Sequence, residues 1–475
     1  MHFHQIYDGG LSQYAYLIGC EATNKAILID PERDVDRYLR LADELGLTIE
    51  AVAETHIHAD FLSGTHELAA RTGVKVYLSP LGEEEGWGYD WPRLSNAEVI
   101  YLRDGDTVPV GELEVAARHT PGHTPEHLTF LIREPNAPSA IGAITGDFLF
   151  VGDLGRPDLL EVAANIQETM KPSAKALYRS ARQFIEEPEA LQVWPGHGAG
   201  SACGKSLGNM PHSTLGYEKA VNPALQAAER GEDAFLDYIL DAQTEPPLYF
   251  ARMKELNKKG PPLMGRLPMP DRMSVPELSA MRSNGGATFI DARPDRLAFM
   301  RGHLAGALHA PLNPMFCTAV GSVMTEVEAP IILIVEEAGT EEAVRRLVRI
   351  GYDNIIGQAQ PRTLQTYIEA SGDRATIEAI DFAEVERRRG EASVIDVRSG
   401  PEYRKGHISE AIHAPYTRLP EFEGRVPADR PLLVHCGSGA RAAVAAAYLA
   451  RTGREVVLVN DLFANYGKVG EAVKD

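Results

Sequence analysis

Histidine and aspartate residues with the spacing of metal ligands occur along roughly the first 200 residues. His56, His58 and Asp60 alternate within His-Ile-His-Ala-Asp-Phe, directly after an apolar segment, 51–55, that has the character of a buried strand. Further residues of the same types stand beside glycine downstream: His123, Asp147 and His197. Because imidazole and carboxylate groups bind transition metals, the pattern predicts a metal site on loops that leave a set of strands.

The segments around these residues predict the strands and helices that would position them. Residues 25–30, 112–118 and 128–132 are strand-like, and 34–46 has helical apolar spacing between an acidic residue and a closing glycine. Residues 222–240 also have helical spacing, and we expect them to pack on the same domain as an added pair of helices.

Four short motifs occur in a fixed order. They are Thr-His-Ile-His-Ala-Asp (55–60), Thr-Pro-Gly-His-Thr-Pro (120–125), Thr-Gly-Asp (145–147) and Gly-Arg-Pro-Asp (155–158). This set resembles the metallo-beta-lactamase superfamily and, within it, the persulfide dioxygenases, which are similar to glyoxalase II. The resemblance implies an αββα sandwich with a metal at one edge of its sheets. By the same resemblance, one Fe(II) per chain would bind to His56, His123 and Asp147. His58, Asp60 and His197 would either contribute additional metal contacts or lie behind the ligands.

Phe61 bears on the number of metal ions. Binuclear members of the superfamily have a histidine at this position, whereas a phenyl ring has no lone pair to donate. A second site would keep only Asp60, His197 and a shared Asp147. Two imidazoles and one carboxylate with open positions are the set expected for non-heme iron that handles O₂. Zinc is the alternative metal, with a thioester hydrolysis like that of glyoxalase II as the alternative reaction.

An internal repeat fills the second half of the chain. Phe-Ile-Asp-Ala-Arg (289–293) and Arg-Gly-His (301–303) recur at a nearly constant offset as Val-Ile-Asp-Val-Arg (394–398) and Lys-Gly-His (405–407). Strands and helices alternate in each copy, which predicts two small α/β domains around parallel sheets. The Asp-x-Arg and Gly-His pieces resemble the rhodanese family.

Cys436 stands between a predicted strand, 432–435, and an alanine-rich helix, 442–452. A thiol at such a turn faces free backbone N–H groups, which favour anions and lower a cysteine pKa, so Cys436 is predicted to be a nucleophile. Arg441 adds fixed positive charge. The Cys-x4-Arg spacing resembles the rhodanese loop and implies sulfane sulfur as cargo; the alternative is an inert, buried cysteine. The residues of this sulfur-binding loop are Gly437, Ser438, Gly439 and Ala440.

The first copy differs at the corresponding segment, Val-Glu-Glu-Ala-Gly-Thr (335–340). It has no cysteine, and two carboxylates should repel anions. We therefore expect the first copy to be catalytically silent and to have a structural role.

Cys203 lies six residues after His197 in a glycine-rich segment and should approach the metal edge. It is either a thiol that binds or relays a persulfide or a small residue that fills a tight loop. His119 and His127, which flank His123, are expected to lie behind the ligands or in solvent.

Composition is that of a multidomain protein. The 475 residues, 44% of them hydrophobic, have room for three domains. We expect a metal-binding domain at 1–245, a silent rhodanese-like domain at 270–370 and an active one at 375–475. Prolines and glycines between 245 and 270 predict a connector.

Charge and cysteine content narrow the classes of partner. The net charge of −20 argues against a nucleic-acid partner. No apolar run is long enough to span a bilayer and no signal-like segment opens the chain, so we expect a cytoplasmic protein without a membrane partner. Four widely spaced cysteines predict reduced thiols.

The resemblances together imply a persulfide dioxygenase fused to two rhodanese domains. A low-molecular-weight thiol persulfide and O₂ would be converted to sulfite at the iron, and Cys436 would make or consume thiosulfate. A non-enzymatic sulfur-carrier scaffold with a structural metal is a third alternative, and the sequence leaves a homo-oligomer open.

Overall fold

A computed structural model of the chain describes residues 1–162, 168–241 and 243–474. The chain divides into two units. The first contains Met1–Gln243 and Phe250–Arg266, and the second contains Thr244–Tyr249 and Leu267–Asp475. Both copies of the internal repeat lie in the second unit, and the expected last residue of the second copy, 475, lies outside the described residues.

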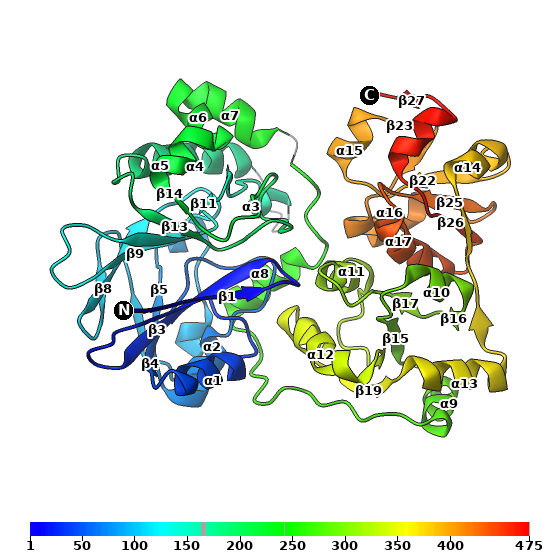
Figure 1. Ribbon diagram of the computed structural model, residues 1–475, viewed down its shortest axis with the longest axis horizontal. Helices are drawn as coiled ribbons and strands as arrows, with labels where there is room; N and C mark the ends of the chain where they lie inside the picture. Colours follow the sequence, from blue (N-terminus) through cyan, green and yellow to red (C-terminus); the bar gives the residue numbers. More distant parts are fainter. Residues whose placement is uncertain (163–167, 242, 475) are drawn as a thin grey trace. The chain divides into compact units, whose positions relative to one another are not determined.

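Two six-stranded mixed sheets form the centre of the first unit (Figure 1). In spatial order, the first sheet contains β1 (His2–Asp8), β2 (Gln13–Gly19), β3 (Lys25–Ile29), β4 (Thr48–Ala53), β5 (Lys75–Leu78) and β6 (Val99–Tyr101). The second contains β14 (Ser213–Thr214), β13 (Gln192–Pro195), β10 (Gly142–Gly146), β9 (Leu128–Arg133), β8 (Leu113–His119) and β7 (Thr107–Val110). A short hairpin, β11 (Leu149–Phe150) and β12 (Asp153–Leu154), follows β10.

Helices cover the outer faces of both sheets (Figure 1). Helices α1 (Asp36–Glu44) and α2 (Thr65–Thr72) pack on the first sheet. Helices α4 (Met170–Phe184), α6 (Pro223–Arg230) and α7 (Glu232–Leu240) pack on the second. The remaining helices of this unit are α3 (Leu159–Val162), α5 (Leu215–Val221) and α8 (Phe250–Lys259). The layers are αββα, which confirms the expected fold.

Side chains that point alternately to the two faces of each strand explain this layering. In β2, Tyr16 and Ile18 belong to the core between the two sheets, whereas Ala15 and Leu17 belong to the core under the helices. Successive side chains of a strand point to opposite faces, so a strand buried on both faces is apolar throughout. All seven residues of β2 are accordingly buried.

The predicted connector between 245 and 270 contains a helix. Helix α8 lies between Pro247 and Pro261, so the prolines flank the helix and do not interrupt it. It belongs to the first unit, together with the segment up to Arg266. Sequence reasoning missed this helix because the prolines on either side dominated the local pattern.

The two copies in the second unit have parallel sheets with the same strand order. The first copy contains β17 (Leu308–His309), β15 (Thr288–Asp291), β18 (Ile331–Ile334) and β19 (Ile355–Ala359). The second contains β24 (Ile412–His413), β22 (Ser393–Asp396), β25 (Leu432–His435), β26 (Val456–Val459) and an additional strand, β21 (Glu378–Ile380). Each copy also has a small antiparallel pair, β16 (His303–Leu304) with β20 (Arg374–Ala375) and β23 (His407–Ile408) with β27 (Ala472–Val473). The expected α/β architecture with parallel sheets is confirmed.

Helices surround these sheets. Those of the first copy are α9 (Val275–Asn284), α10 (Arg296–Arg301), α11 (Phe316–Val323), α12 (Thr340–Arg349) and α13 (Pro361–Ser371). Those of the second are α14 (Phe382–Arg388), α15 (Gly400–Lys405), α16 (Leu419–Phe422) and α17 (Ala440–Arg451). Short 3-10 helices lie at Glu83–Glu85, Trp91–Leu94, Glu337–Gly339, Tyr416–Arg418, Glu423–Arg425 and Phe463–Lys468.

The recurring Asp-x-Arg motif braces each copy. Arg398 binds the carboxylate of Asp396 at 2.5 Å and donates to the carbonyl oxygen of Gly406 at 2.8 Å. In the first copy, Arg293 makes the equivalent bonds to Asp291 and to Gly302. The motif therefore ties the end of the first central strand to the end of the following helix in both copies.

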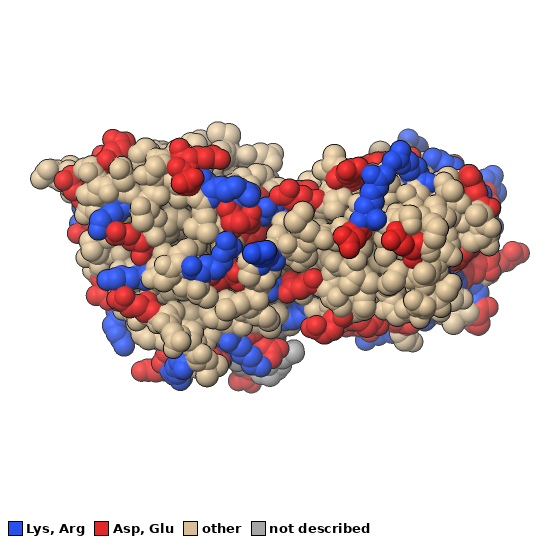
Figure 2. Space-filling view, turned by 90° about the horizontal axis from the view of Figure 1, so that it is seen from below, with Lys and Arg blue, Asp and Glu red and all other residues tan. Residues whose placement is uncertain are grey.

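Charged side chains of both signs are interspersed over the face seen in Figure 2. The chain carries 67 acidic and 47 basic residues, so the excess is acidic. None of the helices in the described residues has the length and apolar character needed to cross a membrane.

Candidate functional site

Loops at the carboxyl ends of four strands bring the predicted ligands together. His56 follows β4, His123 follows β8, Asp147 follows β10 and His197 follows β13. The Oδ2 atom of Asp147 lies 3.9 Å from Nε2 of His56 and 3.6 Å from Nε2 of His123. All four side chains are buried. The predicted trio His56, His123 and Asp147 is thus one cluster with its ligand atoms within 4.8 Å of one another.

Hydrogen bonds fix which ring nitrogen of each histidine faces the cluster. The hydroxyl of Thr55 donates to Asp30 at 2.8 Å, so Nδ1–H of His56 donates to the same hydroxyl at 2.8 Å. Nδ1–H of His123 donates to the carbonyl oxygen of Arg156 at 2.9 Å. Both Nε2 atoms therefore carry a lone pair directed toward Asp147, as in metal-binding histidines.

The cluster has the character of a cation site. In the described chain, Nε2 of His123 and both carboxylate oxygens of Asp147 have no hydrogen-bond partner. Burial lowers the pKa of both His56 and His123 and raises the pKa of Asp147 to about 6. Each buried, unsatisfied polar group costs about 1–3 kcal/mol, and a ligand that pairs with the set would remove that cost. Two neutral imidazoles and a carboxylate fit a divalent metal ion.

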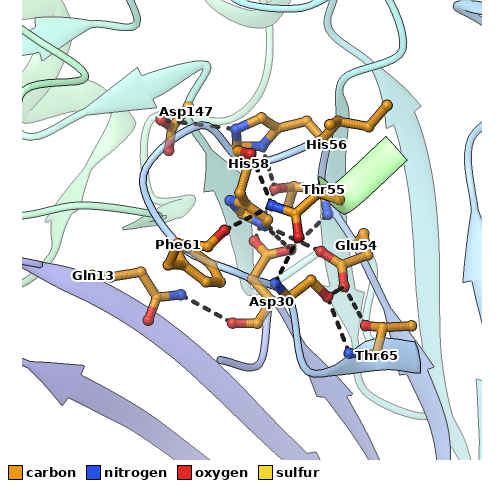
Figure 3. A network of polar contacts seen from close by, with 12 residues as sticks. Gln13, Asp30, Glu54, Thr55, His56, His58, Phe61, Thr65 and Asp147 are labelled. Carbon is orange, nitrogen blue, oxygen red and sulfur yellow. Dashed lines mark hydrogen bonds and ion pairs between the residues drawn. The ribbon is translucent and has the colours of Figure 1, made fainter. Parts of the chain in front are cut away.

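The ring of His58 packs 4.3 Å from the ring of His56, and its Nε2 atom contacts a different set of residues. Its Nε2 lies 3.2 Å from both Asp30 Oδ1 and Glu54 Oε2. Figure 3 labels the three residues within this network of polar contacts. Although burial opposes protonation, the two carboxylates raise the pKa of His58 well above its usual value. The ring of Phe61 lies 4.4 Å from the His58 ring. His58 therefore belongs with Asp30 and Glu54 to a third buried cluster of potential ligand groups beside the His56 cluster.

Asp60, His197 and Cys203 form a neighbouring cluster. Nε2 of His197 lies 3.3 Å from Asp60 Oδ2 and 3.4 Å from Asp147 Oδ1, so Asp147 borders both clusters. A Cβ atom at Gly196 would come within 2.7 Å of Asp147 Oδ1, which explains the glycine before His197. Burial raises the pKa of the Cys203 thiol well above its usual value, and the carboxylates of Asp147 and Asp60 add to the shift.

His127 positions Asp147 from behind. Its Nε2 accepts the backbone N–H of Asp147 at 3.0 Å, and its Nδ1–H donates to the hydroxyl of Thr120 at 2.9 Å. His119 instead donates to the carbonyl of Pro125 at 2.7 Å. Of the two flanking histidines, His127 therefore contacts a predicted ligand.

Helix α8 holds the loop that carries the histidine motif. The buried side chain of Asn257 donates to the carbonyl oxygens of His58, at 2.9 Å, and Phe61, at 2.7 Å. It also accepts the backbone N–H of Ser63 at 2.8 Å. Sequence reasoning missed this residue, since no local signal connects a helix near residue 255 with a loop near residue 60.

The cysteine loop of the second copy curls around its sulfur. Cys436 is buried at the end of β25, and the backbone N–H of Gly439 donates to its Sγ at 3.1 Å. Gly439 has a φ of 88°, in the left-handed region that favours glycine, and α17 begins at the next residue. The loop therefore presents the backbone N–H of Gly439 and the start of α17 to the thiol.

Arg441 is paired within the protein. Its guanidinium donates to both carboxylate oxygens of Glu402, at 2.6 and 2.7 Å. Despite partial burial, Arg441 lowers the pKa of Glu402 to about 2. Glu402 thus offsets the positive charge that the sequence assigned to the loop. Burial raises the pKa of Tyr416 to about 12, and its hydroxyl lies near both Arg441 and Cys436, a neighbour that sequence reasoning missed.

The first copy contacts the loop of the second. Nη2 of Arg296 donates to the carbonyl oxygen of Ser438 at 3.1 Å, and its Nε donates to Asn460 at 2.7 Å. Strand register places Val335 where the second copy has Cys436, because Ile334 pairs with Asp291 as His435 pairs with Asp396. The first copy therefore presents no thiol at this position but supports the loop that does.

Comparisons with known proteins agree with this architecture. Residues 8–197 match the Metallo-beta-lactamase superfamily, and residues 381–466 match the Rhodanese-like domain. The mitochondrial persulfide dioxygenase ETHE1 of Mus musculus is 30% identical over 224 residues, which are 46% of this chain and 74% of that protein. The chain belongs to the metallo-beta-lactamase superfamily.

Other members of the superfamily are similar to larger or smaller parts of the chain. A solved structure of a metallo-beta-lactamase from Staphylococcus aureus subsp. aureus COL is 37% identical, with a TM-score of 0.66, and covers 76% of this chain and 99% of its own. A hydroxyacylglutathione hydrolase of Rhodospirillum rubrum is 30% identical over 184 residues, which are 39% of this chain and 61% of that protein. The metallo-beta-lactamase part of this chain is therefore similar to proteins named for different reactions.

Proposed function

We propose that this member of the superfamily is a persulfide dioxygenase that also transfers sulfur. The observation that carries the proposal is that His56, His123 and Asp147 form one buried ligand set, with ligand atoms within 4.8 Å of one another. His58, the alternate histidine of the motif, is held by carboxylates, and Phe61 offers no ligand atom. One metal with open positions suits O₂ chemistry at iron.

The proposed cofactor is one Fe(II) per chain, held by His56, His123 and Asp147. When bound, it would supply the coordination positions at which O₂ and a thiol persulfide react to give sulfite. Thr55 and Arg156 orient the two imidazoles, and His127 orients the carboxylate. Cys203 stands at the edge of this set, where we propose that its thiol contacts the persulfide.

We propose that Cys436 exchanges the sulfane sulfur of thiosulfate. Its thiolate attacks the outer sulfur, the S–S bond to the sulfite group breaks, and sulfite leaves as Cys436 becomes a persulfide. The reverse direction makes thiosulfate from a Cys436 persulfide and sulfite. Backbone N–H groups of the loop, such as that of Gly439, stabilise the sulfur anion in both directions.

Metal content and gas consumption test the first activity. Protein purified without chelators should contain one iron per chain and should consume O₂ and release sulfite when a low-molecular-weight thiol persulfide is added. Asp147→Asn should lose both the iron and the O₂ uptake, whereas His212→Ala, at an exposed histidine, should retain them. Two zinc ions per chain, together with no O₂ uptake when persulfide is added, would overturn the proposal.

A zinc-dependent thioester hydrolase is the second candidate. The observation that favours it is the Asp60 and His197 pair beside the shared Asp147, since a second metal would acidify a bound water for hydrolysis. The similarity to a hydroxyacylglutathione hydrolase points the same way. Hydrolysis of a glutathione thioester by zinc-loaded protein, faster than persulfide-dependent O₂ uptake by iron-loaded protein, would favour this candidate.

A further inference from the structure

Lys254 on α8 is a buried cation. Its side chain is 1% exposed. Within the parts of the chain that the structure describes, its ammonium finds no hydrogen-bond acceptor. An unpaired buried ion costs several kcal/mol, and such groups are normally paired or placed for a ligand. Among the described residues, Lys254 therefore has no hydrogen-bonded counterion.

Helix α8 places Lys254 on the face that contacts the metal loop, which is the loop after β4 that carries His56. Lys254 and Asn257 are three residues apart on α8, so they lie on the same face of the helix. Asn257 binds the loop after β4 through three hydrogen bonds. The end of the helix is anchored as well, because the carbonyl oxygen of Lys258 accepts the backbone N–H of Asp90 at 2.8 Å.

The surroundings of Lys254 belong to the candidate metal centre. Its Nζ lies 5.2 Å from the centre of the Trp87 ring. It is close enough to Cys203 and Glu126 for electrostatic interaction with both. After burial, Lys254 is also the largest influence that lowers the pKa of His123. The ammonium thus lies within electrostatic range of His123 and Cys203.

The protein's own anions in this region do not satisfy Lys254. Asp158 is engaged with Arg156, whose guanidinium donates to both carboxylate oxygens, at 2.6 and 2.7 Å. One oxygen of Glu126 accepts the backbone N–H of Ile57 at 2.7 Å, and the other has no hydrogen-bond partner in the described residues. A positive group beside a metal centre, with no acceptor of its own, is suited to an incoming anion.

We propose that Lys254 binds the anionic sulfur group at the metal centre, namely the terminal sulfur of a persulfide and the sulfite formed from it. The choice of anion rests on the proposed function. An ammonium donates up to three hydrogen bonds, and the Trp87 ring offers an apolar surface for a polarizable sulfur. The thiol that carries the persulfide can also have carboxylates, and these are the other source of negative charge that Lys254 could bind. We favour the sulfur anion because Lys254 shares a face of α8 with Asn257, which binds the loop that carries His56, and its ammonium is within electrostatic range of Cys203.

Titration calorimetry with sodium sulfite under argon tests the proposal on the metal-loaded full chain. Lys254→Met should weaken sulfite binding by roughly 10- to 100-fold, the value of one charge-assisted contact. Lys259→Met on the same helix is the matched control and should bind sulfite like the wild type, because Lys259 is exposed and paired with Glu255. Titration with S-methylglutathione, which has the carrier's carboxylates but no anionic sulfur, should give equal affinities for all three proteins.

Three results would overturn the proposal. One is the absence of sulfite binding to the wild type, or equal binding by Lys254→Met. Another is a loss of S-methylglutathione binding with sulfite binding retained, which assigns Lys254 to the carrier. The third is a lower urea midpoint for Lys254→Met, since removal of an unpaired buried charge should leave stability unchanged or raised. These measurements involve no turnover, so a wild type that binds sulfite through Lys254 but consumes no O₂ would refute the proposed function alone.

Discussion

Replacing Asn257 by alanine tests whether α8 holds the metal loop. The substitution removes three buried hydrogen bonds, two to the carbonyl oxygens of His58 and Phe61 and one from the N–H of Ser63. Alanine provides no replacement, so two carbonyl groups and one N–H group lose their partner in a buried loop. At about 1 kcal/mol for each bond, the first unit should lose about 3 kcal/mol of unfolding free energy. The metal should also dissociate faster, because the loop carries His56.

Tryptophan fluorescence during urea unfolding measures this loss in the first unit alone, because the chain's three tryptophans, Trp87, Trp91 and Trp194, all lie there. With a urea dependence of about 3 kcal/mol/M, the midpoint should fall by about 1 M. Asn96→Ala, at an exposed asparagine of the same unit, is the matched control and should leave the midpoint unchanged. A loss below about 0.5 kcal/mol for Asn257→Ala, the range of neutral surface changes, would refute this role for α8.

Three further predictions concern the cysteine loop and the metal set. Cys436→Ser should abolish thiosulfate sulfurtransferase activity while persulfide-dependent O₂ uptake persists; full transferase activity would mean that another thiol carries the sulfur. Phe61→His should raise the zinc bound per chain toward two and lower O₂ uptake, because the second ion shares Asp147; one metal and unchanged uptake would show that other groups close the second site. Glu402→Gln should destabilise the second unit by about 1 kcal/mol at neutral pH, a value reduced for solvent screening of a partly exposed pair. Because Arg441 lowers the pKa of Glu402 from 4.5 to about 2, this contribution is present above pH 4.5 and is lost as the pH falls toward 2. Thermal unfolding followed by circular dichroism should therefore show the two proteins converging near pH 2, and a constant difference over that range would contradict the assignment.

Much of the fold and of the candidate site could be predicted because the signals are local. Strand β3 was predicted at 25–30 from a run of apolar residues, and its side chains enter the cores on both faces of the sheet. Cys436 could be identified because a strand, a turn with glycines and a helix are consecutive in the chain. The grouping of His56, His123 and Asp147 was implied by the resemblance of four short motifs to a known family, and each motif is itself a local signal.

Features that depend on distant partners could not be predicted. The pairing of His58 with Asp30 depends on how two strands are placed side by side, and that of Arg441 with Glu402 joins residues 39 positions apart. The contact of Arg296 with Ser438 crosses from one copy of the repeat to the other. Spacing along the chain carries no information about such pairs, because each depends on the packing of whole elements.

The sequence by itself determined which chemical groups this protein presents: imidazoles and carboxylates after strands, a thiol in a glycine-rich turn and two related α/β copies. These follow from residue type and short-range periodicity, which act over a few residues. Only the tertiary structure decided the state and direction of those groups. It turned His58 toward carboxylates, paired Arg441 within the protein and brought α8, with Lys254 and Asn257, to the metal loop. The physical reason is that protonation and pairing depend on burial and on atoms within a few ångströms, and folding brings those atoms together from distant parts of the chain.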